Sequence, residues 1–168
     1  PAQARLIREH ISANFKGLPA TDSIYTYDDA LERHQLALLN TVIKKAKESE
    51  RAYTCLKMAW ICRGKAESLS EELPNYKAQL KELKGQEKEL LENAYTGFET
   101  AFSKESFPMC GMDEITVSYL LAELARRIGK FEESSRWISR VLISRDANDR
   151  IKNRAREIKE LLNKDMHK

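Results

Sequence analysis

The 168-residue chain has few residues of the kinds that interrupt regular structure or carry catalysis, with 4 Pro, 6 Gly, 3 Cys and 3 His. No stretch approaches the ~20 consecutive apolar residues that a membrane-spanning helix needs. The first ten residues, PAQARLIREH, lack the apolar run of a secretory signal. These absences predict a cytoplasmic protein built from long uninterrupted elements. Because the chain does not begin with Met, we expect it to be part of a longer protein.

The three cysteines, Cys55, Cys62 and Cys110, form no CxxC pair, so we expect no metal site in this chain. An odd number of cysteines without a framework spacing is typical of free thiols in a reducing compartment. Cys55 and Cys62 lie seven residues apart on one predicted helix. Free cysteines of this kind are usually small apolar core residues, and we expect that role here.

Motifs for catalysis are also missing, since the chain has no Gly-rich phosphate loop, no HExxH and no nucleophile signature. His34 lies on an apolar helix face, which favours a packed core residue over a ligand. Glu71 and Glu72 are adjacent in sequence and therefore do not face each other on a helix. We predict no enzyme activity and no cofactor.

Apolar residues recur at spacings of three and four throughout the chain, and no run alternates as a strand does. The pattern predicts an all-α protein of about seven helices joined mostly by short links, which make sequential helices antiparallel. Asp28 or Asp29, and Asp113, are expected to cap helix starts, and Gly129 to end a helix. The expected helices cover about 2–15, 28–47, 50–69, 74–104, 113–128, 130–145 and 148–166, with the polar segment 84–89 projecting or kinked.

A pattern of alternating large and small residues repeats along three of these helices. Small residues let a neighbouring helix approach closely, and large ones fill the space beside it. The three occurrences are Phe131, Ser134, Ile138 and Val141; Leu91, Ala94, Phe98 and Ala101; and Tyr27, Ala30, His34 and Ala37.

The clearest unit, about 115–146, resembles the tetratricopeptide (TPR) repeat, a helix–turn–helix with small residues at fixed crossings. Gly129, Lys130 and Phe131 stand in place of that family's Gly-Asp-Tyr turn, and Ser134 stands where Ala is usual. The second unit is split by residues 64–88, and the first shows only its second helix clearly. The resemblance implies a short right-handed TPR-like array of stacked antiparallel helix pairs, in one domain. Its parts are residues 1–27 (helix and loop), 28–146 (helix pairs, with an insertion at 64–88) and 147–168 (capping helix).

Four segments in order, ISANFKG, YDDALERHQLALLNTVIKKAK, CLKMAWICRGKAE and YLLAELARRIGKFEESSRWISRVL, resemble a bacterial domain-of-unknown-function family, number 2225. The resemblance covers nearly the whole chain and implies the same helical architecture. Members usually carry paired CxxC motifs upstream, which implies a zinc-ribbon-like segment in the parent protein. No catalytic residues come with this family.

The first helix of each TPR-like pair lines a concave surface. We predict a non-enzymatic interaction or scaffold module that binds a peptide or partner helix in a shallow groove, with Arg63 and Arg126 pairing acidic groups. Trp, Tyr and Arg are the types enriched at binding hot spots. The alternative for Trp60 and Tyr119 is a core position. The predicted groove residues are Tyr53, Trp60, Arg63, Tyr119, Glu123, Arg126 and Arg127.

Charge is unevenly distributed. Residues 126–168 hold 13 Lys/Arg and 7 Asp/Glu, a net charge of +6, whereas residues 1–125 carry −3. A nucleic-acid-associated protein is therefore the alternative function, although helical spacing spreads these cations over several faces. The last helix has an apolar stripe that either covers the open end of the array or forms a homodimer contact, comprising Ile151, Ala155, Ile158 and Leu162.

Overall fold

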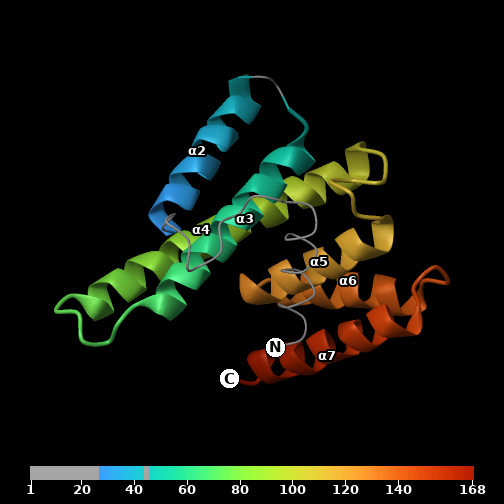
Figure 1. The fold of residues 1–168 in the computed structure, drawn as a ribbon. Coiled ribbons are helices and arrows are strands. Elements are labelled where there is room, and N and C mark those ends of the chain that lie inside the picture. Colours follow the sequence, from blue (N-terminus) through green and yellow to red (C-terminus); the bar gives the residue numbers. More distant parts are fainter. Residues whose placement is uncertain (1–26, 44–45) are drawn as a thin grey trace. The chain divides into compact units, whose positions relative to one another are not determined.

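The computed structural model describes residues 27–43 and 46–168, and within these ranges the chain is all-α, as predicted (Figure 1). The predicted helix at 2–15 lies outside the described residues, so the count of seven helices stays a prediction. No helix in the described part has the length and apolar character to cross a membrane. The described ranges contain six helices: α2 (Tyr27–Ile43), α3 (Glu48–Ser68), α4 (Tyr76–Lys104), α5 (Glu114–Arg127), α6 (Phe131–Ile143) and α7 (Asp149–Met166).

Local signals set several helix ends. The Asp113 carboxylate accepts a hydrogen bond from the Thr116 amide at 2.7 Å, which confirms the predicted cap of α5. Gly129 has φ +85°, and the amide of Lys130 donates to the Ala125 carbonyl at 2.8 Å. This is the Schellman arrangement expected of a glycine after a helix end. Asp28 and Asp29 are not caps, because α2 already begins at Tyr27 and both lie in its first turn.

The chain divides into two compact units between Gly97 and Phe98, inside α4. In the first unit, α2 and α4 both pack on α3, whose side chains are buried on nearly every side. Small residues mark the closest approaches. A Cβ atom added to Gly97 on α4 would lie 2.8 Å from the Ala52 Cβ on α3, and one added to Gly64 would lie 2.9 Å from the Tyr27 ring. Helix spacing in this unit is therefore set by the absence of side chains at glycine.

The polar segment 84–89, which was expected to project or kink, lies within α4, and α4 is continuous from Tyr76 to Lys104. Leu83 just before it is buried. Glu87 accepts a hydrogen bond from Arg63 Nε at 2.7 Å, and Cys62 Sγ lies 3.9 Å from Gln86 Oε1. The segment thus pairs with α3 through polar contacts, which the apolar pattern alone does not reveal.

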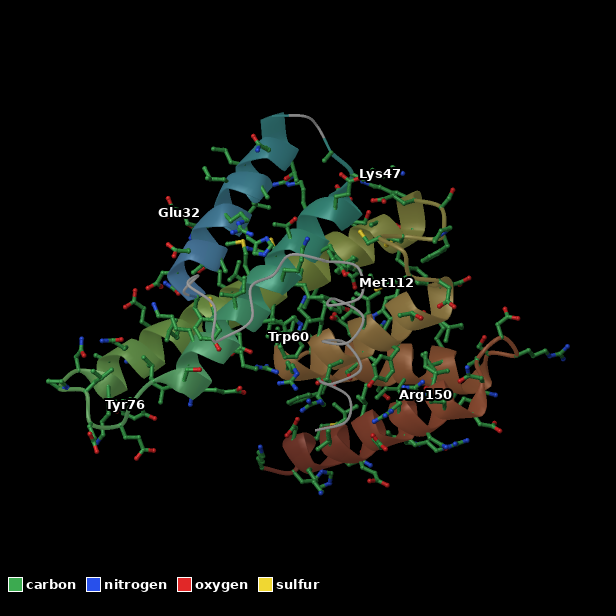
Figure 2. All side chains as sticks on the ribbon, viewed as in Figure 1. Glu32, Lys47, Trp60, Tyr76, Met112 and Arg150 are labelled. Carbon is green, nitrogen blue, oxygen red and sulfur yellow. The ribbon has the colours of Figure 1, made fainter. Side chains whose placement is uncertain are left out.

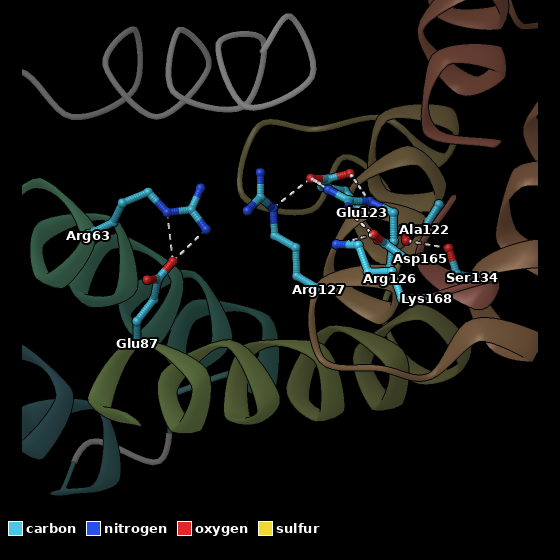
Figure 3. Close-up of polar contacts among 9 residues, drawn as sticks. All are labelled: Arg63, Glu87, Ala122, Glu123, Arg126, Arg127, Ser134, Asp165 and Lys168. Atoms are coloured by element: carbon cyan, nitrogen blue, oxygen red, sulfur yellow. Dashed lines mark hydrogen bonds and ion pairs between the residues drawn. The ribbon is translucent and has the colours of Figure 1, made fainter. Parts of the chain in front are cut away.

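In the second unit, α5, α6 and α7 contact one another in all three pairings. α5 and α6 form the predicted hairpin, and Ser134 lies at its crossing, completely buried. The Ser134 hydroxyl donates to the Ala122 carbonyl at 2.8 Å (Figure 3). A serine at this alanine-like position keeps the close approach and satisfies its own hydroxyl inside the core.

The predicted stripe of α7 faces the interior of this unit, with Ala155, Ile158 and Leu162 buried and Ile151 half-buried. Asn148 caps the helix by accepting from the Ile151 amide at 2.9 Å. The chain itself therefore covers the stripe, and a homodimer stays a prediction.

The repeat pattern marks most buried positions: Leu91, Ala94, Phe98 and Ala101 are all buried along α4, whereas Tyr27, Ala37 and Phe131 are half-buried. Ala30 and His34 are buried on α2 as well. Two expectations stay predictions: that the helix pairs stack as in a TPR array, and that the whole chain forms one domain.

Gly97 and Gly85 provide a matched test of the close helix approach, since both lie in α4 and only Gly97 contacts another helix. Gly85→Ala should stabilise the fold by about 1 kcal/mol through helix propensity. Gly97→Ala gains the same propensity but forces Ala52 away, at a cost of about 1–3 kcal/mol. Urea denaturation of both variants should give changes of opposite sign. Equal stabilisation by both would show that the two helices do not approach as described.

Candidate functional site

Three predicted groove residues lie on α3. Arg63 Cζ is 4.4 Å from the Trp60 ring centroid, a cation–π geometry. The Arg63 guanidinium also forms an ion pair with Glu87 of α4, and both side chains are 15% exposed (Figure 3). Trp60 is half-buried. Arg63 thus contacts both the Trp60 ring (Figure 2 labels Trp60) and a carboxylate from the neighbouring helix, and both α3 side chains keep part of their surface in solvent.

Tyr53 differs from Trp60, because it is only 6% exposed. Lys57 Nζ lies 4.8 Å from the Tyr53 ring centroid, and Lys57 is itself buried. Nearby on α2, burial and then the charges of Lys57 and Arg33 lower the pKa of His34 to about 4. His34 is therefore a neutral, packed side chain at neutral pH. Tyr53 belongs to this buried cluster and supports α3 from inside.

The other four predicted residues lie on α5 and include a fully buried carboxylate, Glu123, at 0% exposure. Its Oε1 accepts from Arg126 Nη2 at 2.8 Å and from Arg127 Nε at 2.6 Å, and its Oε2 accepts from Arg126 Nε at 3.3 Å (Figure 3). A buried charge is tolerated only when it is paired and hydrogen-bonded. Two arginines meet that requirement for Glu123.

Arg126 connects this carboxylate to α7. Its Nη1 donates to Asp165 Oδ2 at 2.8 Å, and Lys168 lies 3.3 Å from the other oxygen of Asp165. Burial disfavours the Arg126 charge, but hydrogen bonds and charges of Glu123 and Asp165 outweigh it, so the Arg126 pKa is raised. Burial alone would raise the Asp165 pKa, but Arg126 and Lys168 hold it below its usual value. The result is a continuous charged network from α5 to the end of α7.

Tyr119 lies one turn before Glu123 and is 1% exposed. Burial, followed by the negative charge of Glu123, raises the pKa of Tyr119 well above its usual value. Its hydroxyl finds no hydrogen-bond acceptor or donor within the described ranges. The burial favours the core alternative for Tyr119. Tyr53, predicted only as a groove residue, is buried as well.

The charges on these arginines are already matched by carboxylates of the chain. Arg63 holds Glu87, and Arg126 holds Glu123 and Asp165. A partner's acidic group would therefore have to share these guanidiniums with them. Glu123 lies three and four residues before Arg126 and Arg127, so these two pairs can be predicted from helical spacing. Asp165 and Glu87 come from other helices, and no spacing within one segment reveals them.

The described ranges contain no candidate metal site, because no three His, Cys, Asp or Glu side chains lie close enough together to bind a metal ion. Cys55 and Cys62 are buried free thiols, and burial raises the pKa of both. Raised thiol pKa values mean little thiolate and low reactivity at neutral pH.

Glu123→Gln tests the buried network. The glutamine keeps the volume but removes the charge that Arg126 and Arg127 share, so the free energy of unfolding should fall by about 2–4 kcal/mol. Glu160→Gln, an exposed change on α7, should alter it by less than ~0.5 kcal/mol. Chemical denaturation measures both. A Glu123→Gln protein as stable as the Glu160→Gln control would contradict the network.

The chain belongs to a bacterial family, because residues 1–162 match the family model described as "Uncharacterized protein conserved in bacteria (DUF2225)". This confirms the family resemblance noted in the sequence. Comparisons with curated proteins and with solved structures gave no match. The family match supports the bacterial description, and the helical description comes from the structure.

Proposed function

We propose that this DUF2225-family chain is a non-enzymatic interaction or scaffold module that binds a peptide or helix of another protein. The observation that carries the proposal is the α3 pair of Trp60 and Arg63, stacked at 4.4 Å and held by Glu87. The α3 surface is defined here as these three residues.

The α3 surface has the features of an interaction hot spot. Trp and Arg are the residue types over-represented there. Glu87 restrains Arg63 before binding, so less side-chain freedom is lost when a partner arrives. Only Nε and Nη2 of Arg63 contact Glu87, and a guanidinium has five N–H donors. Arg63 therefore keeps the capacity to donate to a partner's carbonyl or carboxylate while it stays on Trp60.

The remaining predicted groove residues take supporting roles in this proposal. Tyr53 is buried on α3, the helix that carries Trp60 and Arg63, whereas Tyr119 and Glu123 are buried on α5. Arg126 and Arg127 stay partly accessible, with side chains 12% and 20% exposed, but both are committed to Glu123. We therefore assign partner contact first to Trp60 and Arg63.

Nucleic-acid binding through the basic C-terminal third is the second candidate, and one observation favours it. Lys152, Arg156 and Lys159 follow each other on α7 at spacings of four and three, away from its buried stripe. Carboxylates interrupt the neighbouring faces, where Arg154 lies 3.8 Å from Glu157. Three cations in one row are few for phosphate-backbone binding, so we rank this function lower.

Arg63→Ala and Arg51→Ala form a matched pair for the interaction proposal, since both change an arginine on α3 and Arg51 is exposed away from Trp60. Cross-linking in bacterial cells followed by quantitative mass spectrometry should identify a co-captured protein. Its recovery should fall at least about tenfold with Arg63→Ala and Trp60→Ala, as for hot-spot residues. Recovery with Arg51→Ala should match the unmodified chain.

Thermal melting of the same variants provides the control. If Trp60→Ala costs several kcal/mol of stability, about the 3–5 kcal/mol of a buried aromatic, Trp60 is a core residue and the α3 surface is not a binding site. Equal losses of partner with Arg63→Ala and Arg51→Ala would also contradict the proposal.

Binding to mixed-sequence DNA and RNA at 50 and 200 mM salt separates the two candidate functions. If three cations bind phosphates, affinity should fall by about 40-fold between these concentrations, from a log–log slope near −2.7. The interaction proposal predicts no tight binding at either salt concentration. Tight binding with that slope, lost when Lys152, Arg156 and Lys159 become alanine, would favour the nucleic-acid function.

A further inference from the structure

A second surface of different chemistry lies within residues 98–168, where three aromatic rings meet beneath an arginine. Phe102 lies in the last turn of α4, Phe107 lies between α4 and α5, and Trp137 lies on α6. The Phe102 centroid is 4.9 Å from that of Trp137 and 5.3 Å from that of Phe107, both edge-to-face. All three rings are half-buried, so their outer edges remain at the surface.

Arg140 covers this cluster. Its Cζ lies 5.0 Å from the Phe102 centroid and 5.5 Å from the Trp137 centroid. The side chain is still 50% exposed, and its contact to Glu114 is long, 3.5 Å. A charge-assisted N–H···O bond is usually about 2.7–2.9 Å, so Glu114 fills the carboxylate position beside Arg140 only loosely. The stacked guanidinium is thus oriented, exposed and incompletely paired.

Two further exposed side chains extend the surface along α6. Arg136 lies one turn before Arg140 and has no ion pair in the part of the chain that the structure describes. Ile143 lies three residues after Arg140 and is 81% exposed. Two carboxylates, Glu132 and Glu133, lie on this side of the helix in its first turn, and Glu133 pairs with Lys130 at 3.8 Å. We name this the α6 surface: Phe102, Phe107, Arg136, Trp137, Arg140 and Ile143.

We propose that the α6 surface binds an acidic peptide segment of another protein, with two carboxylates on Arg136 and Arg140 and an apolar side chain against Ile143. Residues four apart on a helix lie about 6 Å apart. Two acids at i and i+4 of a helical peptide, or at i and i+2 of an extended one, match that separation. A planar carboxylate accepts two parallel N–H bonds from a guanidinium, and stacking on the rings fixes the plane of Arg140 for them.

This inference rests on the proposed function, because it assumes that the chain is an interaction module, but it uses a surface that shares no residue with Trp60 and Arg63. The partner's chemistry follows from the charges present: two arginines, an exposed isoleucine and aromatic edges. A neutral apolar partner would leave Arg136 and Arg140 desolvated without a counter-charge, which is costly.

Selection from a random dodecapeptide phage library on the immobilised chain tests the proposal. Enriched peptides should carry a pair of Asp or Glu residues at the stated spacings next to an apolar residue. The enriched peptides are then synthesised with a fluorescein label, and their Kd for each variant is measured. Arg140→Gln and Arg136→Gln should each raise the Kd at least about tenfold, the effect expected when a charged pair is lost. Arg150→Gln, an exposed arginine change on α7, is the matched control and should change Kd by less than about twofold.

Arg140→Lys separates recognition from simple charge, because lysine keeps the charge but cannot form the bidentate pair. It should lose affinity nearly as much as Arg140→Gln, with the melting curve unchanged. The proposal is overturned if no peptide is enriched or if the enriched peptides lack acidic residues. It is also overturned if a mixed-sequence oligonucleotide of the same net charge as the peptide displaces it. Peptides whose binding depends on Arg63 but not on Arg140 would contradict the α6 proposal and leave the α3 proposal intact.

Discussion

The carboxylate of Glu123 is the constraint on which the second unit depends. Removing a charge completely from water is expensive unless other groups satisfy it. Here Arg126 and Arg127 of the same helix do so, and Arg126 also reaches Asp165 on α7. The end of α7 is thereby tied to α5 through Arg126, and the apolar stripe of α7 packs beneath that tie. The polar residues of α5, which resemble a binding surface in sequence, are therefore paired with other residues of the same chain.

The close approach of helices at small residues is the second constraint, and it leaves particular faces for function. Gly97 against Ala52, and Ser134 against the Ala122 carbonyl, bring helices near enough that large side chains must turn elsewhere. Trp60 and Arg63 on α3 are half-buried, and Arg136 and Arg140 on α6 are exposed. These are the groups to which we assign partner contact in the two proposals.

Local features were predictable from the sequence, because their causes lie within a few residues. The Asp113 cap and the Gly129 turn follow from backbone needs at a helix end, and the structure shows both. The large–small pattern located buried positions on three helices. The assignment of Asp28 or Asp29 as the cap was wrong, because α2 already includes Tyr27 and both aspartates lie in its first turn. Cap positions depend on a boundary that sequence signals place only approximately.

Roles that depend on which helix lies opposite were not predictable in the same way. Tyr119 and Trp60 have the same character in sequence, yet Tyr119 is buried and Trp60 is half-exposed. The partners of Arg63 and Arg126 on other helices, Glu87 and Asp165, are 24 and 39 residues distant along the chain. Such pairs exist only once the helices have packed.

A double-mutant cycle of Arg126→Met and Asp165→Asn tests most directly whether the polar face of α5 holds α7 in place. The pair is mostly buried, with side chains 12% and 21% exposed. The account predicts a coupling energy of about 1–2 kcal/mol, between the values for surface and buried pairs, and faster amide exchange in α7 for either single variant. A coupling energy indistinguishable from zero, with α7 exchange unchanged, would contradict it.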